Sequence, residues 1–338
     1  MSKLSLSVSL LDQLKSIAYL TSEFLEAVVF TESSCSRGYP NGLKFSLTSY
    51  LKYYNLLGCN HSDISLTIGH IKVSDFHVVI QRYSNNNNND NYKGIMFFIH
   101  GYLDHVGLYH KYFKFLLDNN YIVIAIDLPG HGLSSGKLGE IGDFGQYALS
   151  IEAAVEAVRN KYQNYHIPYY ISGFSAGAAW VTEYLLRNRH AELFQKVILL
   201  APLVRVPMWY FNKIAYYLSS VIKFVPRQPK KISHDPVFLN FVKYNDPLQP
   251  QFVPLKWVRA MHHWGDRLPK YKPLEIPALI IQGTEDQTID WKYNIPNIIA
   301  KIFPNHQAHY IPGAYHNLCN ESDKYREQVF KYIINYIS

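Results

Sequence analysis

The chain has 338 residues, which corresponds to about two domains of roughly 150 residues or to one large α/β domain with an insertion. Hydrophobic residues make up 48% of the sequence and charged residues 17%, which excludes an intrinsically disordered chain. The net charge of +7 comes without a nucleic-acid-binding motif, so no nucleic-acid partner is expected. Three scattered cysteines, Cys35, Cys59 and Cys319, fit neither a disulfide framework nor a metal site, which predicts a reducing, cytoplasmic location.

The N-terminus and the hydropathy of the chain bear on membrane insertion. The first residues lack the features of a signal peptide, and no run of apolar residues is long enough to cross a bilayer. The sequence therefore predicts a protein that is not integral to a membrane.

The positive charge is concentrated between Leu203 and Lys272, where twelve Lys and Arg residues stand against three Asp residues. This segment has a net charge of +9, whereas the rest of the chain has 21 basic and 23 acidic residues and a net charge of −2. A surface of this kind suits an anionic lipid surface or a phosphate-bearing substrate, or else it is only a solvated face.

In chain order, an amphipathic helix is predicted first, over residues 12–30, because apolar residues recur there at helical spacing. A hairpin of residues 65–72 and 76–83 follows, and then a loop with five consecutive Asn residues at 85–89. Beyond this loop, unbroken apolar runs predict buried strands, and the segments between them predict helices. The strands are residues 94–100, 121–127, 169–173, 196–201 and 278–283, and the helices are residues 108–118, 148–162 and 176–189.

Strands and helices in alternation predict an α/β fold, with a mostly parallel central sheet flanked by helices. The alternation stops between strands 196–201 and 278–283, so we expect residues 203–272 to form an inserted, mainly helical cap. The core is then residues 56–202 and 273–338, and residues 1–55 form a helical extension at the N-terminus.

The segment 206–226 of the expected cap is apolar and aromatic, with Lys213 and Lys223 as its only charges. Two interpretations stay open: the helix packs onto the sheet domain, or it lines the path of an acyl chain. In the second case Trp209, Phe211 and Tyr217 are the candidate substrate contacts.

The most specific motif is Gly-Phe-Ser-Ala-Gly at residues 173–177, which lies between a predicted strand and a predicted helix. In this context G-x-S-x-G forms a tight turn that exposes the serine at the carboxyl edge of the sheet. Small residues at Gly173 and Gly177 allow the strand and the helix to approach closely. Ser175 is therefore the candidate nucleophile, and a glycine-rich structural turn is the alternative.

A serine hydroxyl needs a base, and the base needs an acid that orients it. Asp286 follows the strand 278–283, and His316 follows the last predicted strand, residues 309–313, so the order is Ser175, Asp286 and His316. Glu285 and Asp290 are the competing acids, although Asp290 can equally cap a helix.

The tetrahedral intermediate of acyl transfer needs two backbone N–H donors for its oxyanion. One candidate is the amide of Ala176, which follows the nucleophile at the start of a helix. The other is the amide of Tyr102, in the loop that begins with His100 and Gly101. The alternative for this loop is that it only closes the strand.

These motifs resemble the α/β-hydrolase branch of monoacylglycerol lipases and bacterial lysophospholipases, a group that includes serine aminopeptidases of the S33 type. The resemblance rests on residues 100–116, 127–136, 173–177, 282–290 and 313–321, which occur in the family's order. It implies the α/β-hydrolase fold, a catalytic triad of Ser175, Asp286 and His316, and oxyanion amides at Tyr102 and Ala176. It implies no metal and no cofactor.

The function expected from these features is hydrolysis of lipid esters with one acyl chain, with a lysophospholipid as the leading substrate. A monoacylglycerol lipase or a general carboxylesterase is the alternative. An aminopeptidase is less favoured because the cap has only three acids to hold an ammonium group, and a non-catalytic binding module is less favoured because the triad is intact. No obligate protein partner is expected. The basic cap suggests peripheral contact with an anionic surface at the inner face of the membrane.

Overall fold

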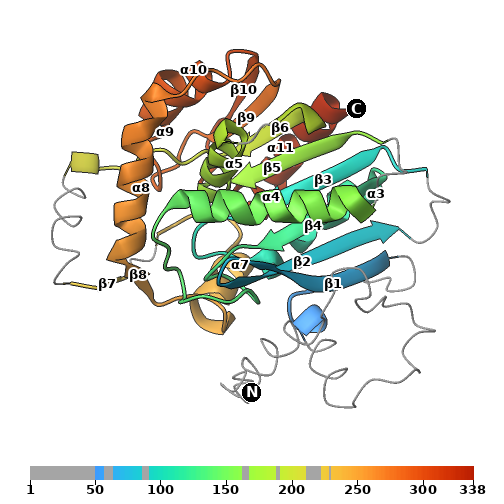
Figure 1. Ribbon diagram of the computed structural model, residues 1–338, viewed down its shortest axis with the longest axis horizontal. Helices are drawn as coiled ribbons and strands as arrows, with labels where there is room; N and C mark the ends of the chain where they lie inside the picture. The colour runs from blue at the N-terminus through green and yellow to red at the C-terminus, as the bar shows by residue number, and fades with distance from the viewer. Residues whose placement is uncertain are drawn as a thin grey trace.

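A twisted sheet of eight strands forms the centre of the protein (Figure 1), in the order β1-β2-β4-β3-β5-β6-β9-β10. The structure is a computed structural model that describes residues 50–56, 64–85, 91–161, 167–187, 191–210, 222–227 and 230–338. The helix predicted over residues 12–30 and most of the expected N-terminal extension lie outside the described residues.

The strands from β4 to β10 in this order pair in parallel, and β2 pairs antiparallel with both β1 and β4. The strands are β1 (Ile64–Val73), β2 (Phe76–Asn85), β3 (Gly94–Ile99), β4 (Tyr121–Asp127), β5 (Tyr169–Phe174), β6 (Phe194–Leu200), β9 (Ala278–Gly283) and β10 (His306–Ile311). Every residue of β3, β4, β5 and β9 is buried, because helices cover both faces of the sheet. The predicted hairpin and the mostly parallel sheet are confirmed.

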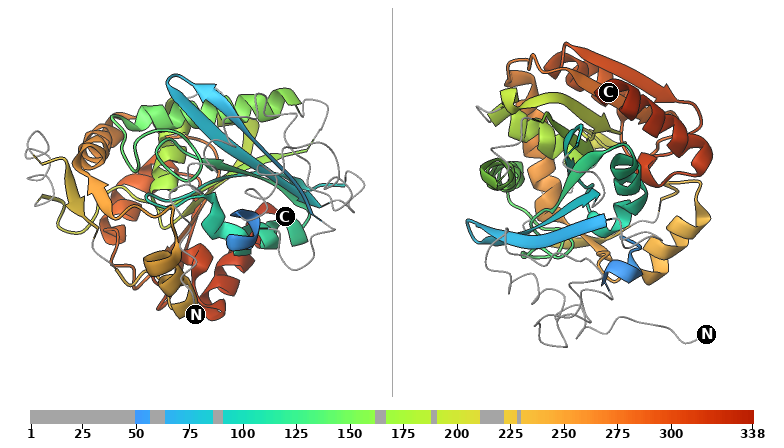
Figure 2. Two further views of the ribbon diagram at one scale, coloured as in Figure 1. Left: turned by 90° about the horizontal axis from the view of Figure 1, so that it is seen from below. Right: turned by 90° about the vertical axis from the view of Figure 1, so that its right-hand side faces the viewer.

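Helices lie on both faces of the sheet, with α4 and α5 on one side and α3 and α11 on the other (Figure 2). The longer core helices are α3 (His110–Asp118), α4 (Phe144–Lys161), α5 (Ala176–Arg187) and α11 (Asp323–Ile337). Shorter helical segments are η2 (Val106–Tyr109), η3 (Ala191–Leu193), α9 (Trp291–Asn294), η6 (Ile295–Ile299), α10 (Ala300–Ile302) and η7 (Leu318–Asn320). No helix in the described ranges has the length and apolarity needed to cross a bilayer.

The described residues between β6 and β9 add no strand to the central sheet. They form α7 (Pro236–Asn240), η4 (Phe241–Asn245), α8 (Leu255–Arg267), η5 (Leu268–Lys270) and a two-stranded sheet of β7 (Phe224–Pro226) and β8 (Phe252–Pro254). Helix α8 is amphipathic and lies against the core, where Trp264 Nε1 donates to the buried carboxylate of Glu183 on α5 at 3.0 Å. Arg267 on α8 also forms an ion pair of 3.1 Å with Asp143. Residues of the expected cap are thus tied directly to the helices that cover the sheet.

Candidate active site

Ser175 lies in the tight turn between β5 and α5, as the G-x-S-x-G motif predicts. Its φ of +54° is in the left-handed region, which costs a non-glycine residue about 1–3 kcal/mol. The turn is held by two backbone hydrogen bonds to β6 and its following loop: Ser175 N donates to Leu200 O at 2.8 Å, and Leu203 N donates to Ser175 O at 3.1 Å. The surrounding sheet therefore fixes a strained backbone that presents the Ser175 hydroxyl at the carboxyl edge of β5.

The two glycines of the motif are required by the close approach of α5 to the sheet. A Cβ at Gly177 would lie 2.3 Å from Ile99 O and 2.4 Å from His100 O, and a Cβ at Gly173 would lie 2.5 Å from Gly177 O. These distances are much shorter than real Cβ contacts, and the atoms concerned belong to the backbone. Glycine at both positions therefore allows the N-terminus of α5 to lie directly beside the end of β3, where the loop of His100, Gly101 and Tyr102 begins.

His316 and Asp286 complete a chain of hydrogen bonds with Ser175. His316 Nε2 lies 2.8 Å from Ser175 Oγ, and His316 Nδ1 lies 2.7 Å from Asp286 Oδ2. All three residues are buried except for a small exposed fraction, between 6% and 8% of each residue, which opens the site to one side. The structure thus brings together the three residues that the sequence analysis selected as nucleophile, acid and base.

Asp286 is held as a carboxylate by its neighbours. Burial raises its pKa, but the charge and hydrogen bond of His316, with the hydrogen bonds from Gln282 and Thr288, outweigh burial and hold the pKa of Asp286 below its ordinary value. Gln282 Nε2 donates to Asp286 Oδ2 at 3.0 Å, while Thr288 N and Ile289 N donate to Oδ1 at 2.7 and 3.3 Å. A charged Asp286 fixes the His316 ring with its Nδ1–H toward the carboxylate and its Nε2 toward the serine.

The two competing acids, Glu285 and Asp290, lie away from the His316 ring nitrogens. Glu285 is exposed, and its amide donates to Ala314 O at 3.0 Å. Asp290 caps α9, where its carboxylate accepts the Tyr293 amide at 3.3 Å. Neither side chain contacts His316, so geometry leaves Asp286 as the acid of the chain.

The loop after β3 carries the amide of Tyr102, the predicted partner of Ala176. His100 is completely buried and links this loop to the end of β4, since its Nε2 accepts Leu128 N at 3.1 Å and its Nδ1 lies 2.7 Å from Gly101 O. Within the described part of the chain, neither the Tyr102 amide nor the Ala176 amide donates to a protein acceptor. Both N–H groups are therefore available to a substrate oxygen beside Ser175.

Residues of the expected cap hold this loop from two sides. The Tyr102 ring stacks on Trp257 of α8, with ring centroids 3.6 Å apart and an interplanar angle of 12°. Further along the loop, His105 Nε2 lies 3.1 Å from Asp246 Oδ2, and Tyr54 donates to Asp246 Oδ1 at 2.7 Å. Burial lowers the pKa of His105, but the Asp246 carboxylate outweighs burial and raises it. Side chains from three distant segments thus fix the conformation of the Tyr102 loop.

Glu321 is a positioning residue that the sequence analysis did not select. It is fully buried, and its Oε1 accepts the amide of Tyr315, the residue before His316, at 2.7 Å. The same carboxylate accepts the His234 amide at 2.8 Å from the expected cap. The only sequence signal for this role is that Glu321 falls within the segment 313–321, which carries the family resemblance.

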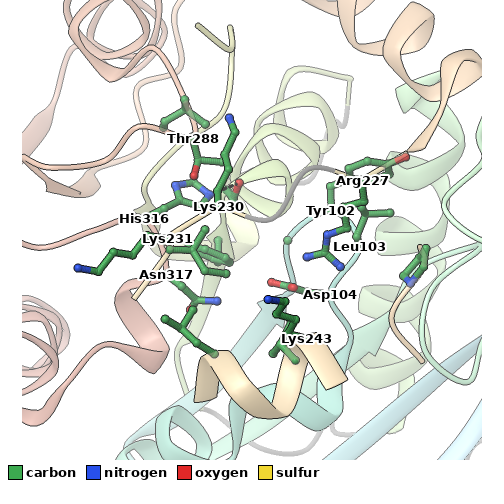
Figure 3. Close-up of a pocket in the computed structure, with 18 of the residues that line it drawn as sticks. Tyr102, Leu103, Asp104, Arg227, Lys230, Lys231, Lys243, Thr288, His316 and Asn317 are labelled. Carbon is green, nitrogen blue, oxygen red and sulfur yellow. Dashed lines mark hydrogen bonds between the residues drawn. The ribbon is translucent and has the colours of Figure 1, made fainter. Parts of the chain in front are cut away.

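Ser175, His316 and Tyr102 open onto one cavity of about 650 Å³, whose walls are mostly apolar. Figure 3 shows Arg227, Lys243 and Asp104 on one side of the cavity and Lys230 beside His316 on the other. Apolar side chains of Leu103, Phe174, Leu203, Val206 and Ile289 line the cavity together with Trp257, and the polar side chains of Asp104, Arg227, Lys230, Lys231 and Lys243 also line it.

One of the three candidate substrate contacts, Trp209, lies elsewhere than predicted. Trp209 does not line this cavity: it is 5% exposed and packs under α8, with its ring 3.8 Å from that of His262 and next to Gly265. The Trp209 ring packs against α8, so it is not exposed to a substrate in this cavity. Phe211 and Tyr217 lie outside the described residues.

The chain is similar in sequence to several known proteins. A family profile described as "Serine aminopeptidase, S33" matches residues 90–323, well over half of the chain. A monoglyceride lipase homolog of monkeypox virus is 26% identical over 255 residues, which cover 72% of this chain and 89% of the viral protein. A phospholipase of Bacillus subtilis is 24% identical over 246 residues, which cover 70% of this chain and 92% of that protein.

Among solved structures, a soluble variant of monoglyceride lipase from Saccharomyces cerevisiae, in complex with a substrate analog, superposes with a TM-score of 0.71. It is 20% identical, and the match covers 80% of this chain and 93% of the yeast chain. A monoacylglycerol lipase of Paleococcus ferrophilus superposes with a TM-score of 0.62 at 21% identity, covering 72% of this chain and 93% of the other. These likenesses show the α/β-hydrolase fold.

Proposed function

The chain belongs to the serine aminopeptidase, S33 family, and on this premise we propose that it hydrolyses lipid esters with a single acyl chain, lysophospholipids foremost. It is a serine ester hydrolase with the α/β-hydrolase fold. The observation that carries the proposal is the hydrogen-bonded chain of Ser175, His316 and Asp286 at the wall of a mostly apolar cavity of about 650 Å³. A cavity of this size and polarity is typical of sites that enclose a small apolar ligand.

In the proposed reaction, Ser175 Oγ attacks the ester carbonyl carbon while His316 Nε2 takes the hydroxyl proton. The amides of Tyr102 and Ala176 hold the oxyanion of the tetrahedral intermediate. The intermediate collapses when the C–O bond to the alcohol breaks, and His316 returns the proton to the leaving oxygen. A water molecule then repeats the sequence on the acyl-enzyme and releases the fatty acid. Asp286 keeps the His316 ring oriented and stabilises its positive charge in both halves.

Charge and the intact catalytic residues support the proposal over the alternatives. The net charge of +9 in residues 203–272 favours a phosphate-bearing lysophospholipid over a monoacylglycerol or an uncharged carboxylic ester. An aminopeptidase needs carboxylates to hold the substrate's ammonium group, and Asp104 is the one carboxylate among the described residues that line the cavity. A binding module that had lost catalysis would not need the intact chain of Ser175, His316 and Asp286.

We expect the purified protein to release fatty acid from a lysophospholipid faster than from a monoacylglycerol with the same acyl chain. The measurement is fatty-acid release under initial-rate conditions, with p-nitrophenyl acetate as the reference short ester. If only the short ester is cleaved, the proposed lipid substrate is wrong and the protein is a general carboxylesterase. If only the monoacylglycerol is cleaved, the positive charge of the cap has no role in substrate choice.

Exposed apolar side chains suggest how the enzyme reaches a lipid substrate. Seven of the ten large apolar residues that are exposed among the described ones belong to residues 203–272, namely Met208, Tyr210, Ile222, Phe224, Val237, Tyr244 and Phe252. Combined with the +9 charge of the same segment, they fit a surface that contacts an anionic bilayer, where each nearby Lys or Arg adds about 1 kcal/mol. Phe224 and Phe252, on the small β7-β8 sheet, are 50% and 56% exposed.

Replacing Phe224 and Phe252 together with Ser is expected to weaken vesicle binding at least about tenfold, because the side chains no longer enter the interface. Flotation with phosphatidylcholine vesicles, with and without phosphatidylglycerol, measures the bound fraction. Tyr310→Ser is the matched control, since Tyr310 is 44% exposed on β10, outside residues 203–272. Equal binding of the double variant and the wild type would contradict the proposed membrane contact.

A further inference from the structure

Four cations surround the catalytic cavity. Arg227, Lys230, Lys231 and Lys243, which we call the cationic rim, all belong to the segment between β6 and β9 and all line the cavity that Ser175 and His316 enter. The three lysines are exposed and Arg227 is half-buried, so the rim lies at the solvent side of the cavity, above the buried serine. Figure 3 shows members of the rim on both sides of the opening.

The rim is not directly paired with carboxylates in the described part of the chain, although the Asp286 carboxylate acts on Lys230 and partly offsets the lowering of the pKa of Lys230 by burial. Among the described residues, none of its four members forms an ion pair with Asp or Glu. Their side chains contact neutral groups: Arg227 donates to Gln249 Oε1, Lys230 Nζ donates to Gln287 O at 3.4 Å, and Lys231 Nζ lies 5.0 Å from the Tyr315 ring centroid. Lys243 Nζ likewise lies 4.7 Å from the centroid of the Tyr244 ring.

Asp104 is the one acid among the described cavity-lining residues, against the four cations of the rim. It is buried, and Tyr109 donates to its Oδ2 at 2.7 Å. Burial raises the pKa of Asp104, against the lowering effects of Tyr109 and Arg227. Cations that surround one concave opening reinforce one another and attract an anion to it, whereas they repel a ligand cation. The cavity is therefore polarised, with a positive mouth and apolar walls.

We infer that the cationic rim is a subsite for the phosphate of an anionic head group, and that it selects lysophospholipids with net negative charge over choline esters and monoacylglycerols. This inference rests on the proposed function and adds the class of head group to it. The ester lies at Ser175, the acyl chain follows the apolar walls, and the phosphate reaches the rim. A choline group would bring a quaternary cation to the same rim and lose part of the attraction that its phosphate gains.

The test compares short-chain, monomeric lysophosphatidylglycerol, lysophosphatidylcholine and monoacylglycerol with one acyl chain in common. Monomeric substrates separate the subsite from any attraction of the enzyme to a charged bilayer. We expect kcat/KM for the anionic ester to exceed that for the choline ester at least about tenfold at low salt. Because exposed charges are screened within about 10 Å at 0.1 M ionic strength, the preference should shrink as salt is added.

Variants assign the preference to the rim. Arg227→Gln combined with Lys243→Gln is expected to lower kcat/KM for lysophosphatidylglycerol at least about tenfold, mainly through KM, and to leave monoacylglycerol hydrolysis within about twofold. Arg227→Lys with Lys243→Arg keeps both charges and should keep the preference. Lys331→Gln removes an exposed charge on α11, outside the cavity, and is the matched control. Melting temperatures report whether each variant is folded.

Each outcome has one meaning. Loss of anionic preference in the double Gln variant, with retention in the charge-preserving variant and the control, supports the subsite. Equal hydrolysis of the three esters by the wild type, or a preference for the choline ester, overturns the subsite and leaves the proposed hydrolase function intact. Hydrolysis of none of the three, while a short ester is cleaved, overturns the lipid substrate itself.

Discussion

Replacing Ser175 with Ala is expected to lower kcat/KM for lysophospholipid hydrolysis by about 10⁴- to 10⁶-fold, the range in which loss of an activated serine nucleophile falls. The physical reason is that no other hydroxyl lies within hydrogen-bonding distance of His316 Nε2, at 2.8 Å from Ser175 Oγ, among the described residues. Fatty-acid release and labelling by a fluorophosphonate probe measure the effect. The probe forms a phosphonyl ester with the serine oxygen as fluoride leaves, so the variant should gain no mass.

The fold should survive this substitution. Alanine has the same Cβ as serine, so the cost of the left-handed φ of +54° is unchanged, and only the hydrogen bond to His316 is lost. Ser150→Ala is the control: Ser150 is fully buried, and its hydroxyl donates within α4, to Gln146 O at 2.9 Å. Full labelling of the Ser175 variant, or a loss of less than about tenfold, would show that another residue is the nucleophile.

The strands that carry the site were predictable because each has the same physical environment along its whole length. β4 and β9 are covered by helices on both faces, so their sequences are unbroken apolar runs, and the predicted bounds 121–127 and 278–283 are those observed. The turn at Ser175 was predictable for a different reason, since two glycines flank it and backbone contacts leave no room for a Cβ at either.

β10 shows where this reasoning fails. It was predicted over residues 309–313 and runs instead from His306 to Ile311. As the last strand it pairs with β9 alone, and most of its residues are half-buried or exposed, so polar side chains such as Gln307 are tolerated and the apolar signal is lost. His316 was located correctly because it follows the strand, whichever bounds the strand has.

Contacts between side chains that lie far apart along the chain could not be predicted from the sequence. Asp246 binds His105 and Tyr54, yet 141 positions separate Asp246 from His105, and no periodicity connects them. The sequence shows the excess charge of residues 203–272, but it does not show which of these cations surround the catalytic cavity. In the same way, the apolar character of Trp209 did not indicate whether the ring faces α8 or the substrate.

The contacts of the Tyr102 loop connect the proposed head-group subsite to the reaction. Trp257 stacks on Tyr102 and also lines the cavity, and Asp246, which holds His105, follows Lys243 of the rim by three positions. The segment that would bind the head group therefore also supports the loop whose amide would hold the oxyanion. In an interior packed without voids, side chains that contact both a substrate and a catalytic loop fix the position of one relative to the other.

Replacing Asp286 with Asn should lower kcat by about 10⁴-fold at neutral pH while the protein stays folded. Asp286 accepts hydrogen bonds at both oxygens, from the Thr288 and Ile289 amides at Oδ1 and from Gln282 and His316 at Oδ2. An Asn oxygen can serve only one of these sides, and the backbone amides cannot turn away. The Asn NH₂ group therefore points at His316, whose Nδ1 becomes the acceptor and whose proton moves to Nε2, so that the ring no longer has a free nitrogen for the serine proton.

Stability should respond to pH with a definite sign. The pKa of Asp286 in the folded protein lies below its unfolded value of about 3.9, so its carboxylate contributes stability above that pH and the contribution is lost as the pH falls through the folded value. The wild type should thus melt at a higher temperature than Asp286→Asn at neutral pH, and the difference should decrease below about pH 4. A difference that grew on acidification would contradict the ionised Asp286.

Asp290→Asn and Glu285→Gln separate the role of Asp286 from a general need for acids in this loop. Asparagine caps a helix about as well as aspartate, so Asp290→Asn should keep α9 and the activity within about twofold. Glu285 is exposed and its side chain is not part of the hydrogen-bonded chain of Ser175, His316 and Asp286, so its variant should also be active. If either control loses as much activity as Asp286→Asn, the acid has been assigned to the wrong residue, because only a carboxylate that contacts His316 Nδ1 can set the tautomer on which proton transfer from Ser175 depends.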